Sequence, residues 1–166
     1  MKRIGLISDT HGKLSKRVVR FLEEVDEIWH AGDIGSEELA DKLMELKPLR
    51  AVYGNIDGHV LRRMYPENLR FFCEEVDVLM THIGGYPGRY EPRIRKAMYA
   101  NPPQLFISGH SHILKVVHDK KINTLHINPG AAGNSGFHNV CTAVRFKIDG
   151  KNISDLEVLE FERTKF

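Results

Sequence analysis

The sequence predicts an α+β protein of the α/β type, in which two mixed β-sheets pack face to face with helices on their outer faces. Short apolar runs and amphipathic helical patterns alternate over the first third of the chain, which is the rhythm of a parallel sheet. Strand-like runs follow, and helical patterns stop after residue 116. The 166 residues suit one domain, residues 1–166, because no linker, repeat or low-complexity tract divides them.

The first third contains three expected strands and two helices. A helix follows the first strand because apolar residues recur at helical spacing between residues 14 and 25. A second helix begins after Ser36, a favourable N-cap, and ends before Pro48. The strands are expected at residues 4–7, 27–31 and 50–53.

The rest of the chain is expected to be mostly β-structure. A looser segment at residues 84–103 contains a short helix at residues 93–99. Asp149-Gly150 is a strong hairpin signal between two long strand-like runs. The expected strands are residues 69–74, 77–81, 105–108, 115–118, 124–127, 140–148 and 153–161.

Composition excludes several classes of protein. The net charge of +2 and the lack of an extended basic stripe argue against nucleic-acid binding. No apolar run approaches the roughly 20 residues of a membrane span, and Lys2-Arg3 leads straight into a short strand, so no signal peptide is expected. A cytoplasmic protein is the expectation, with Cys73 and Cys141 as reduced core thiols. Self-association through the C-terminal strands stays open.

Seven side chains able to bind a metal stand at the ends of predicted strands. Each alone is explained by a turn, a helix cap or a core histidine, but together they are expected to share a site, since open α/β sheets place their sites at the strands' carboxyl ends. Oxygen and imidazole ligands without cysteine suit Mn²⁺, Fe, Zn²⁺, Co²⁺ or Ni²⁺. Seven ligands divide well between two ions if one carboxylate bridges. They are Asp9, His11, Asp33, Asn55, His82, His110 and His112.

These residues lie in short blocks that resemble the signature of the calcineurin-like metallophosphoesterases. The short chain and its series of blocks are similar to the small bacterial and archaeal phosphodiesterase branch of that family. The resemblance runs from Lys2 to about Gly130 and implies a four-layer αββα sandwich. The blocks are Ser-Asp-Thr-His, His-Ala-Gly-Asp, Gly-Asn-x-Asp, Thr-His, Gly-His-Ser-His and Asn-Pro-Gly.

The resemblance also implies a role for each ligand. Two divalent transition-metal ions are implied, Mn²⁺ first, and a hydroxide bridging them attacks phosphorus in line. Asp33, Asn55 and His82 are the residues expected to carry catalysis, through the hydroxide and the positioning of phosphate. One ion is assigned to Asp9, His11 and His112, and the other to Asn55, His82 and His110, with Asp33 bridging.

One position departs from the family pattern. Many members carry a histidine after the Gly-Asn pair, which protonates the leaving group or stabilises the transition state, and Ile56 stands there instead. General acid catalysis is worth roughly 10²–10⁴-fold, so leaving groups of low pKa are expected to be preferred. His59 is the alternative acid, and Asp57 is expected to hold the loop.

Other polar residues have a structural and a functional interpretation. His30 is expected to be structural, and His138 is the one unassigned histidine near the glycine-rich loop at residues 128–136. That loop is either a plain connection or a source of N–H groups for phosphate. The basic residues after residue 88 form either a solvated helix face or a lip near the substrate, where Tyr86 or Tyr90 could stack on a nucleobase. They are Arg89, Arg93, Arg95 and Lys96.

The expected function is hydrolysis of small phosphodiesters or nucleotide-like substrates by a metal-dependent phosphodiesterase. The alternatives are a phosphomonoesterase or nucleotide pyrophosphatase on the same metals, and a non-catalytic metal-binding scaffold, a role that the fold has in the retromer coat. The complete ligand set favours the enzyme, because degraded ligands are the usual mark of the scaffold.

Overall fold

Two five-stranded β-sheets form the body of the protein, and the computed structural model describes residues 1–166. The strands are β1 (Lys2–Ile7), β2 (Glu27–His30), β3 (Leu49–Ala51), β4 (Asn68–Cys73), β5 (Val76–Thr81), β6 (Gly85–Tyr86), β7 (Arg89–Tyr90), β8 (Leu105–Ile107), β9 (Leu114–Asp119), β10 (Thr124–Pro129), β11 (Val140–Asp149) and β12 (Asn152–Glu162). The helices are α1 (Lys16–Leu22), α2 (Glu37–Leu46), α3 (His59–Met64) and α4 (Pro92–Ala100), followed by a 3-10 turn at Arg163–Lys165.

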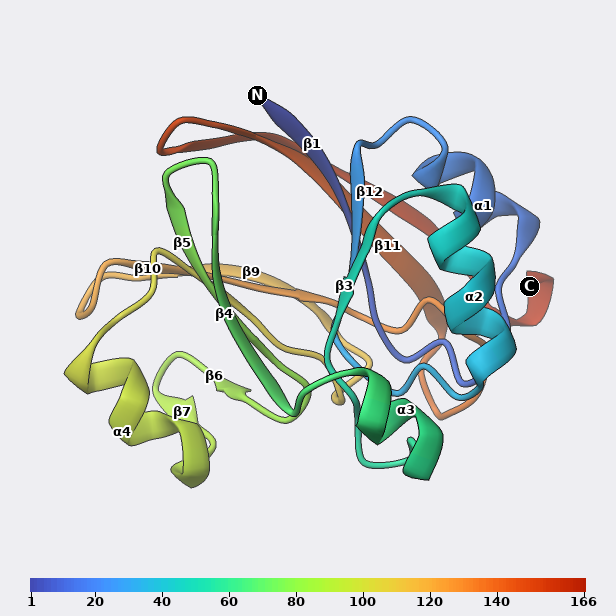
Figure 1. The fold of residues 1–166 in the computed structure, drawn as a ribbon, viewed down its shortest axis with the longest axis horizontal. Helices are drawn as coiled ribbons and strands as arrows, with labels where there is room; N and C mark the ends of the chain where they lie inside the picture. The colour runs from blue at the N-terminus through green and yellow to red at the C-terminus, as the bar shows by residue number, and fades with distance from the viewer.

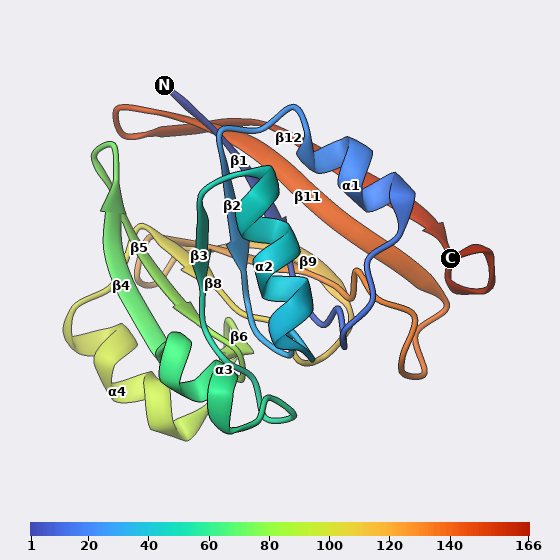
Figure 2. The ribbon, with the colours of Figure 1, turned by 45° about the vertical axis from the view of Figure 1, so that its right-hand side comes forward.

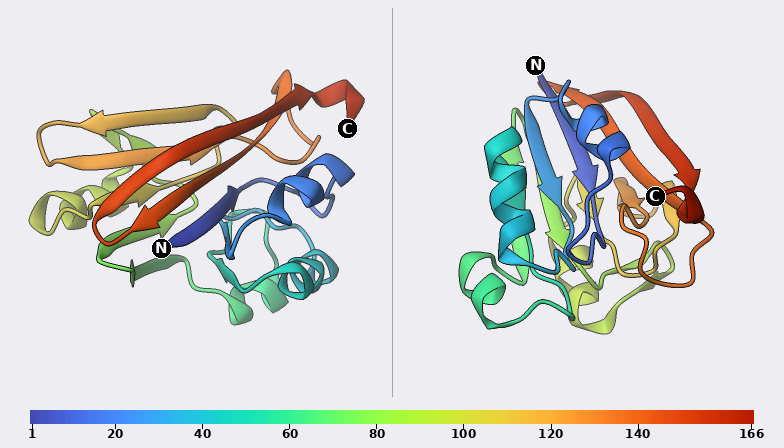
Figure 3. Two further views of the ribbon diagram at one scale, coloured as in Figure 1. Left: turned by 90° about the horizontal axis from the view of Figure 1, so that it is seen from above. Right: turned by 90° about the vertical axis from the view of Figure 1, so that its right-hand side faces the viewer.

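The first sheet has the strand order β12-β11-β1-β2-β3. Its strands β1, β2 and β3 run parallel, which confirms the βαβ rhythm of the sequence. The C-terminal hairpin crosses back to this sheet, because β11 pairs antiparallel with β1 from Lys2↔Ile148 to Leu6↔Val144. Figure 3 shows β1 in blue between β2 and the orange β11.

The second sheet has the order β4-β5-β8-β10-β9, with a parallel centre and antiparallel edges. A small β6–β7 hairpin precedes α4, inside the segment that the sequence left largely irregular. In Figure 2 the strands β1, β2 and β5 run toward the same end of the molecule. Their carboxyl ends therefore lie close together, although they belong to different sheets.

Three apolar clusters stack the layers in the order helix, sheet, sheet, helix, which confirms the expected fold. Trp29 and Met80 meet between the two sheets. Leu22 of α1 and Leu43 of α2 pack on the outer face of the first sheet, and Met98 of α4 packs on the second. Figure 1 shows α1 and α2 on one side of the molecule and α4 on the other.

Local signals explain most element boundaries. The Ser36 hydroxyl accepts a hydrogen bond from the Leu39 N–H, so α2 begins where the sequence predicted. The short α3 was not predicted, since it starts at Gly58 without a side-chain cap and buries only Leu61. Both cysteines are buried and free. No helix of the structure is long and apolar enough to cross a membrane.

Candidate metal centre

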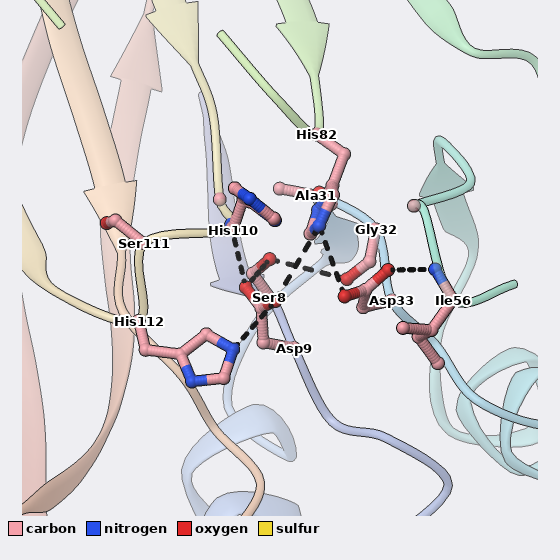
Figure 4. Close-up of polar contacts among 12 residues, drawn as sticks. Ser8, Asp9, Ala31, Gly32, Asp33, Ile56, His82, His110, Ser111 and His112 are labelled. Atoms are coloured by element: carbon pink, nitrogen blue, oxygen red, sulfur yellow. Dashed lines mark hydrogen bonds and ion pairs between the residues drawn. The ribbon is translucent and has the colours of Figure 1, made fainter. Parts of the chain in front are cut away.

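The loops after β1, β2, β5 and β8 bring six of the seven predicted ligands together. Their ligand atoms form two groups, and within each group these atoms lie within 4.8 Å of one another. Figure 4 shows the carboxylates of Asp9 and Asp33 at the centre, with His82 and His112 pointing toward them from different loops. The first group is Asp9, His11 and His112, and the second is Asp33, His82 and His110.

Backbone strain is concentrated at these ligands. Eight residues other than glycine have a positive φ, and five of the eight are predicted ligands. Such a conformation costs roughly 1–3 kcal/mol per residue and persists only where the surrounding structure enforces it, as at functional sites. The five, with φ between 49° and 72°, are Asp9, His11, Asp33, His110 and His112.

The glycines of two sequence blocks are required by close packing around the carboxylates. A Cβ on Gly109 would collide with the Ser8 hydroxyl, and a Cβ on Gly54 would collide with the Asp33 carboxylate. The Gly-His-Ser-His and Gly-Asn blocks therefore begin with glycine because the backbone passes directly against Asp9 and Asp33.

Asp9 is held by one carboxylate oxygen and leaves the other free. Its Oδ2 accepts hydrogen bonds from the Ser8 hydroxyl (2.6 Å) and the His110 backbone N–H (3.0 Å). Its buried Oδ1 has no hydrogen-bond partner and lies 3.2 Å from Nε2 of His112. Burial alone would raise the pKa of Asp9, but the imidazoles of His11 and His112 outweigh it and hold that pKa below its usual range.

Asp33 lies between the two groups. Its Oδ2 is 3.5 Å from Nε2 of His11 and 3.2 Å from Nε2 of His82, which belong to different groups. Its Oδ1 accepts the backbone N–H of Ile56 at 3.0 Å. Burial opposes ionisation of Asp33, yet the neighbouring His82 lowers its pKa. Asp33 is thus placed where a bridging carboxylate would have to be.

Second hydrogen bonds orient two of the imidazoles. Nδ1 of His82 donates to the Ala31 carbonyl (2.8 Å), which leaves the lone pair on Nε2. Nε2 of His138 donates to the Gly133 carbonyl (2.8 Å), so its Nδ1 accepts a hydrogen bond from the Nδ1–H group of His112 (3.1 Å). His112 consequently also presents a bare Nε2 to the site.

The residues fit divalent metal ions. Three buried side-chain atoms of the chain have no hydrogen-bond partner, and all three are in this cluster: Oδ1 of Asp9, Nε2 of His11 and Nε2 of His82. Leaving such atoms unpaired is costly, so a native protein does it where an ion or ligand completes them. Carboxylate and imidazole together form the donor set of divalent transition metals.

The remaining predicted residues surround this cluster. Asn55 is exposed, its side chain makes no hydrogen bond, and it lines a cavity of about 220 Å³ together with His82. His59 is exposed at the start of α3 and does not line that cavity. Asp57 is buried and accepts hydrogen bonds from the backbone N–H groups of residues 34, 35 and 54, which ties together the loops after β2 and β3.

Comparison with known proteins identifies the family. The sequence matches the calcineurin-like phosphoesterase superfamily domain over residues 1–151. The chain belongs to this superfamily. A relative from Methanothermobacter thermautotrophicus, named "Probable metallophosphoesterase", is 30% identical over 135 residues, which cover 77% of this chain and 76% of the relative. The resemblance seen in the sequence blocks is therefore confirmed, as is the class of metal-binding phosphoesterase.

Solved structures share the fold at low sequence identity. Vps29 of Entamoeba histolytica, in a structure with Zn²⁺, has a TM-score of 0.74 at 15% identity and covers 97% of this chain and 99% of its own. A structure described as a novel archaeal phosphodiesterase has a TM-score of 0.73 at 21% identity, covering 95% of this chain and 99% of its own. Both support the superfamily's two-sheet architecture.

The structure also settles three smaller sequence interpretations. His30 is structural, because its Nε2 bonds the Thr10 hydroxyl (2.9 Å) and its Nδ1 accepts the Gly32 N–H. Tyr90 is buried and donates to Asp119, so it is not available to stack on a ligand. Arg93 turns inward to Thr81 and the Ile83 carbonyl, and it does not form a free basic lip.

Two histidines near the centre received no role from the sequence. His138 orients His112, although the two are 26 residues apart. His126 lines a second cavity beside His110. The position of His138 beside the glycine-rich loop was the one available hint, and nothing in the spacing of His126 separated it from a core residue.

Proposed function

We propose that the protein is a metal-dependent phosphodiesterase that hydrolyses small or nucleotide-like phosphodiesters at a two-metal centre. Two observations carry the proposal. Asp33 lies between the two groups of possible ligands, and three buried side-chain atoms of this cluster have no hydrogen-bond partner. The superfamily match supports a phosphoesterase. The fold shared with an archaeal phosphodiesterase supports the diester, and the fold shared with a Zn²⁺-bound protein supports the metal.

In this proposal each ion has its own set of residues. Asp9, His11 and His112 would hold one ion, and Asn55, His82 and His110 the other, with Asp33 shared. Two such cations withdraw charge from the phosphate oxygens and lower the pKa of a bound water so that hydroxide is available near neutral pH. Mn²⁺ is the first expectation, and Fe, Zn²⁺, Ni²⁺ and Co²⁺ are compatible with the same ligands.

The chain's own residues supply orientation and hydrogen bonds. His82 and His112 are fixed with Nε2 toward the centre, because Nδ1 of each donates elsewhere. The side chain of Asn55 is exposed in the cavity that His82 also lines, where its N–H group could donate to a phosphate oxygen and its carbonyl oxygen would be available to an ion. Asp9 is fully buried, which keeps water from its free oxygen.

The leaving group receives no proton from the position after Asn55. Ile56 is exposed there, and its backbone N–H is engaged by Asp33. His59 is the nearest histidine in the sequence, but it is exposed on α3 and forms no hydrogen bond. We therefore propose that the enzyme acts best on esters whose leaving group departs without protonation.

The test compares two activated esters in the presence of Mn²⁺. Bis-p-nitrophenyl phosphate and p-nitrophenyl phosphate are offered to the wild type, to Asp33→Ala and to Asp41→Ala, whose exposed carboxylate on α2 is the matched control. Metal-dependent turnover of the diester should fall more than roughly 100-fold in Asp33→Ala. A loss of up to that size is typical when only a hydrogen-bond partner of a metal ligand is removed. Preference for the monoester would indicate a phosphatase. Two bound metals without turnover of either ester would indicate a scaffold.

A further inference from the structure

A second cavity of about 300 Å³ opens beside the metal centre and has no role in holding the ions. Its wall on the metal side is formed by Gly109 and His110. The β6–β7 hairpin contributes Gly85, Tyr86 and Arg89 to the lining, and β10 contributes His126 and Asn128. We call this space the side cavity. Because it begins at a ligand of the proposed metal site, a group attached to a phosphate there would extend into it.

The hairpin presents an aromatic ring to the side cavity. Tyr86 is 40% exposed, and Nζ of Lys115 lies 3.9 Å from its ring centroid. This cation–π contact fixes the ring, and the Ser108 hydroxyl, which donates to the Gly85 carbonyl (3.3 Å), fixes the hairpin against the second sheet. Ile83 and Ile113 add exposed apolar surface to the lining. The walls therefore suit a flat, partly apolar ring.

A histidine of β10 supplies the cavity with a hydrogen-bond acceptor. His126 is 1% exposed and stacks on Phe106, with ring centroids 5.3 Å apart. Its Nδ1 donates to the Phe106 carbonyl (3.2 Å), so Nε2 is left without a partner from the chain. Burial lowers the pKa of His126 to about 4, which keeps Nε2 an acceptor at neutral pH. His126 lines the side cavity, so this acceptor can receive an N–H or O–H group of a ligand there.

The charged residues of the lining favour a phosphorylated ligand. Arg89 and Lys115 are cationic, whereas the carboxylate of Glu91 is 3.5 Å from the Arg93 guanidinium and is partly neutralised by it. The balance of charge at the cavity is therefore positive. A neutral apolar ligand would gain nothing from these cations, whereas a nucleotide carries its charge beside its ring.

We propose that the side cavity binds the base of a nucleotide-type phosphodiester, with the ring against Tyr86 and an N–H donor toward Nε2 of His126. This assignment rests on the proposed function, since it places the scissile phosphate at the ions beside His110. It names the substrate class of that site: nucleoside phosphate esters, in preference to alkyl or glycerol esters, which offer neither a ring nor an N–H donor.

The kinetic test uses two diesters with the same leaving group. Thymidine 5′-p-nitrophenyl phosphate carries a base with an N–H donor, and methyl p-nitrophenyl phosphate has none. The wild type should prefer the thymidine ester in kcat/KM. Tyr86→Ala should lower that value roughly 5- to 140-fold, the range that corresponds to loss of one base–aromatic stack, and leave the methyl ester unchanged. Tyr86→Phe, which keeps the ring, should retain the preference.

Two variants separate the acceptor of His126 from its structural bond. In His126→Asn the side-chain N–H group can still donate to the Phe106 carbonyl, but the acceptor at Nε2 is lost. In His126→Gln the side-chain carbonyl can replace that acceptor, and the bond to Phe106 is lost. The first should reduce turnover of the thymidine ester about tenfold, and the second should reduce it less. Equal losses on both esters in both variants would mean a structural role for His126.

Failure of the proposal and failure of the proposed function give different results. If both esters are hydrolysed equally well and Tyr86→Ala affects them alike, the side cavity does not bind a base, although the phosphodiesterase stands. If neither ester is hydrolysed, calorimetric binding of AMP and of ribose 5-phosphate to the Mn²⁺-loaded protein decides. Tighter binding of AMP that is lost in Tyr86→Ala supports the base site, and equal binding overturns it.

Discussion

The contact between His138 and His112 predicts that one metal site can be weakened without touching a ligand. His138 Nε2 is committed to the Gly133 carbonyl, so its Nδ1 is an acceptor, 3.1 Å from Nδ1 of His112. His138→Ala removes this acceptor, after which His112 can adopt either tautomer and its ring can turn. Loss of such an outer partner typically costs 10- to 100-fold in metal affinity, or about 1.4–2.8 kcal/mol.

The effect should be confined to the proposed metal site formed by Asp9, His11 and His112. His82 is oriented by a backbone carbonyl of Ala31, which the substitution does not alter. A calorimetric Mn²⁺ titration should therefore show one site weakened by the predicted factor and the other within about twofold of wild type. His118→Ala, which removes an exposed histidine bonded to Asn123, is the control. Equal weakening of both sites, or of neither, would refute the reasoning.

Three further predictions follow from single residues. Asp57→Ala leaves three backbone N–H groups without their acceptor and should lower the free energy of unfolding by at least about 3 kcal/mol in urea titration; a loss below 1 kcal/mol would show that the loops hold without it. Burial lowers the pKa of His30 from 6.5 to about 4, so its stabilising contribution is complete above pH 6.5 and is lost as the pH falls toward 4. The difference in unfolding free energy between wild type and His30→Asn should thus shrink by up to about 3 kcal/mol over that range, and a constant difference would contradict the assignment. Ile56→His should accelerate hydrolysis of esters with poor leaving groups by up to about 10²-fold and change p-nitrophenyl esters little, whereas a flat dependence of the wild-type rate on leaving-group pKa would remove the basis for this prediction.

Six of the seven predicted ligands lie together in the structure, and their positions are tied to local patterns of the sequence. Asp9, Asp33 and His82 each follow an apolar run of strand length, and parallel strands end at a common edge. The sheet to which each strand belongs was harder to predict, because a hairpin pattern such as that of β11 and β12 does not specify the sheet that it joins. The hairpin joins the first sheet because β11 pairs with the free edge of β1, which is more than 130 residues away in the sequence.

The residues that the sequence could not assign act through contacts between distant segments. His126 and His138 stand in stretches where a histidine has no periodic or motif context. Their contacts appear only in the folded chain, where the His126 ring stacks on Phe106 and His138 bonds to His112. Conversely, Tyr90 and Arg93 had the right chemistry for a substrate lip but were needed by Asp119 and Thr81. Tyr86, in contrast, is exposed and lines the side cavity. This difference depends on tertiary packing, which local patterns do not encode.

The left-handed backbone at five predicted ligands has a consequence for how ions would bind to this protein. Contacts within the chain hold this backbone, namely the close-packed glycines and the hydrogen bonds that Asp57 accepts from the loops after β2 and β3. We therefore expect the protein without metal to keep the shape of the centre, so that an ion would not have to fold the chain around itself, unlike the metal of a zinc finger. The supply of metals around the protein would then decide which ion is bound, and exchange of one ion for another would leave the shape of the chain unchanged.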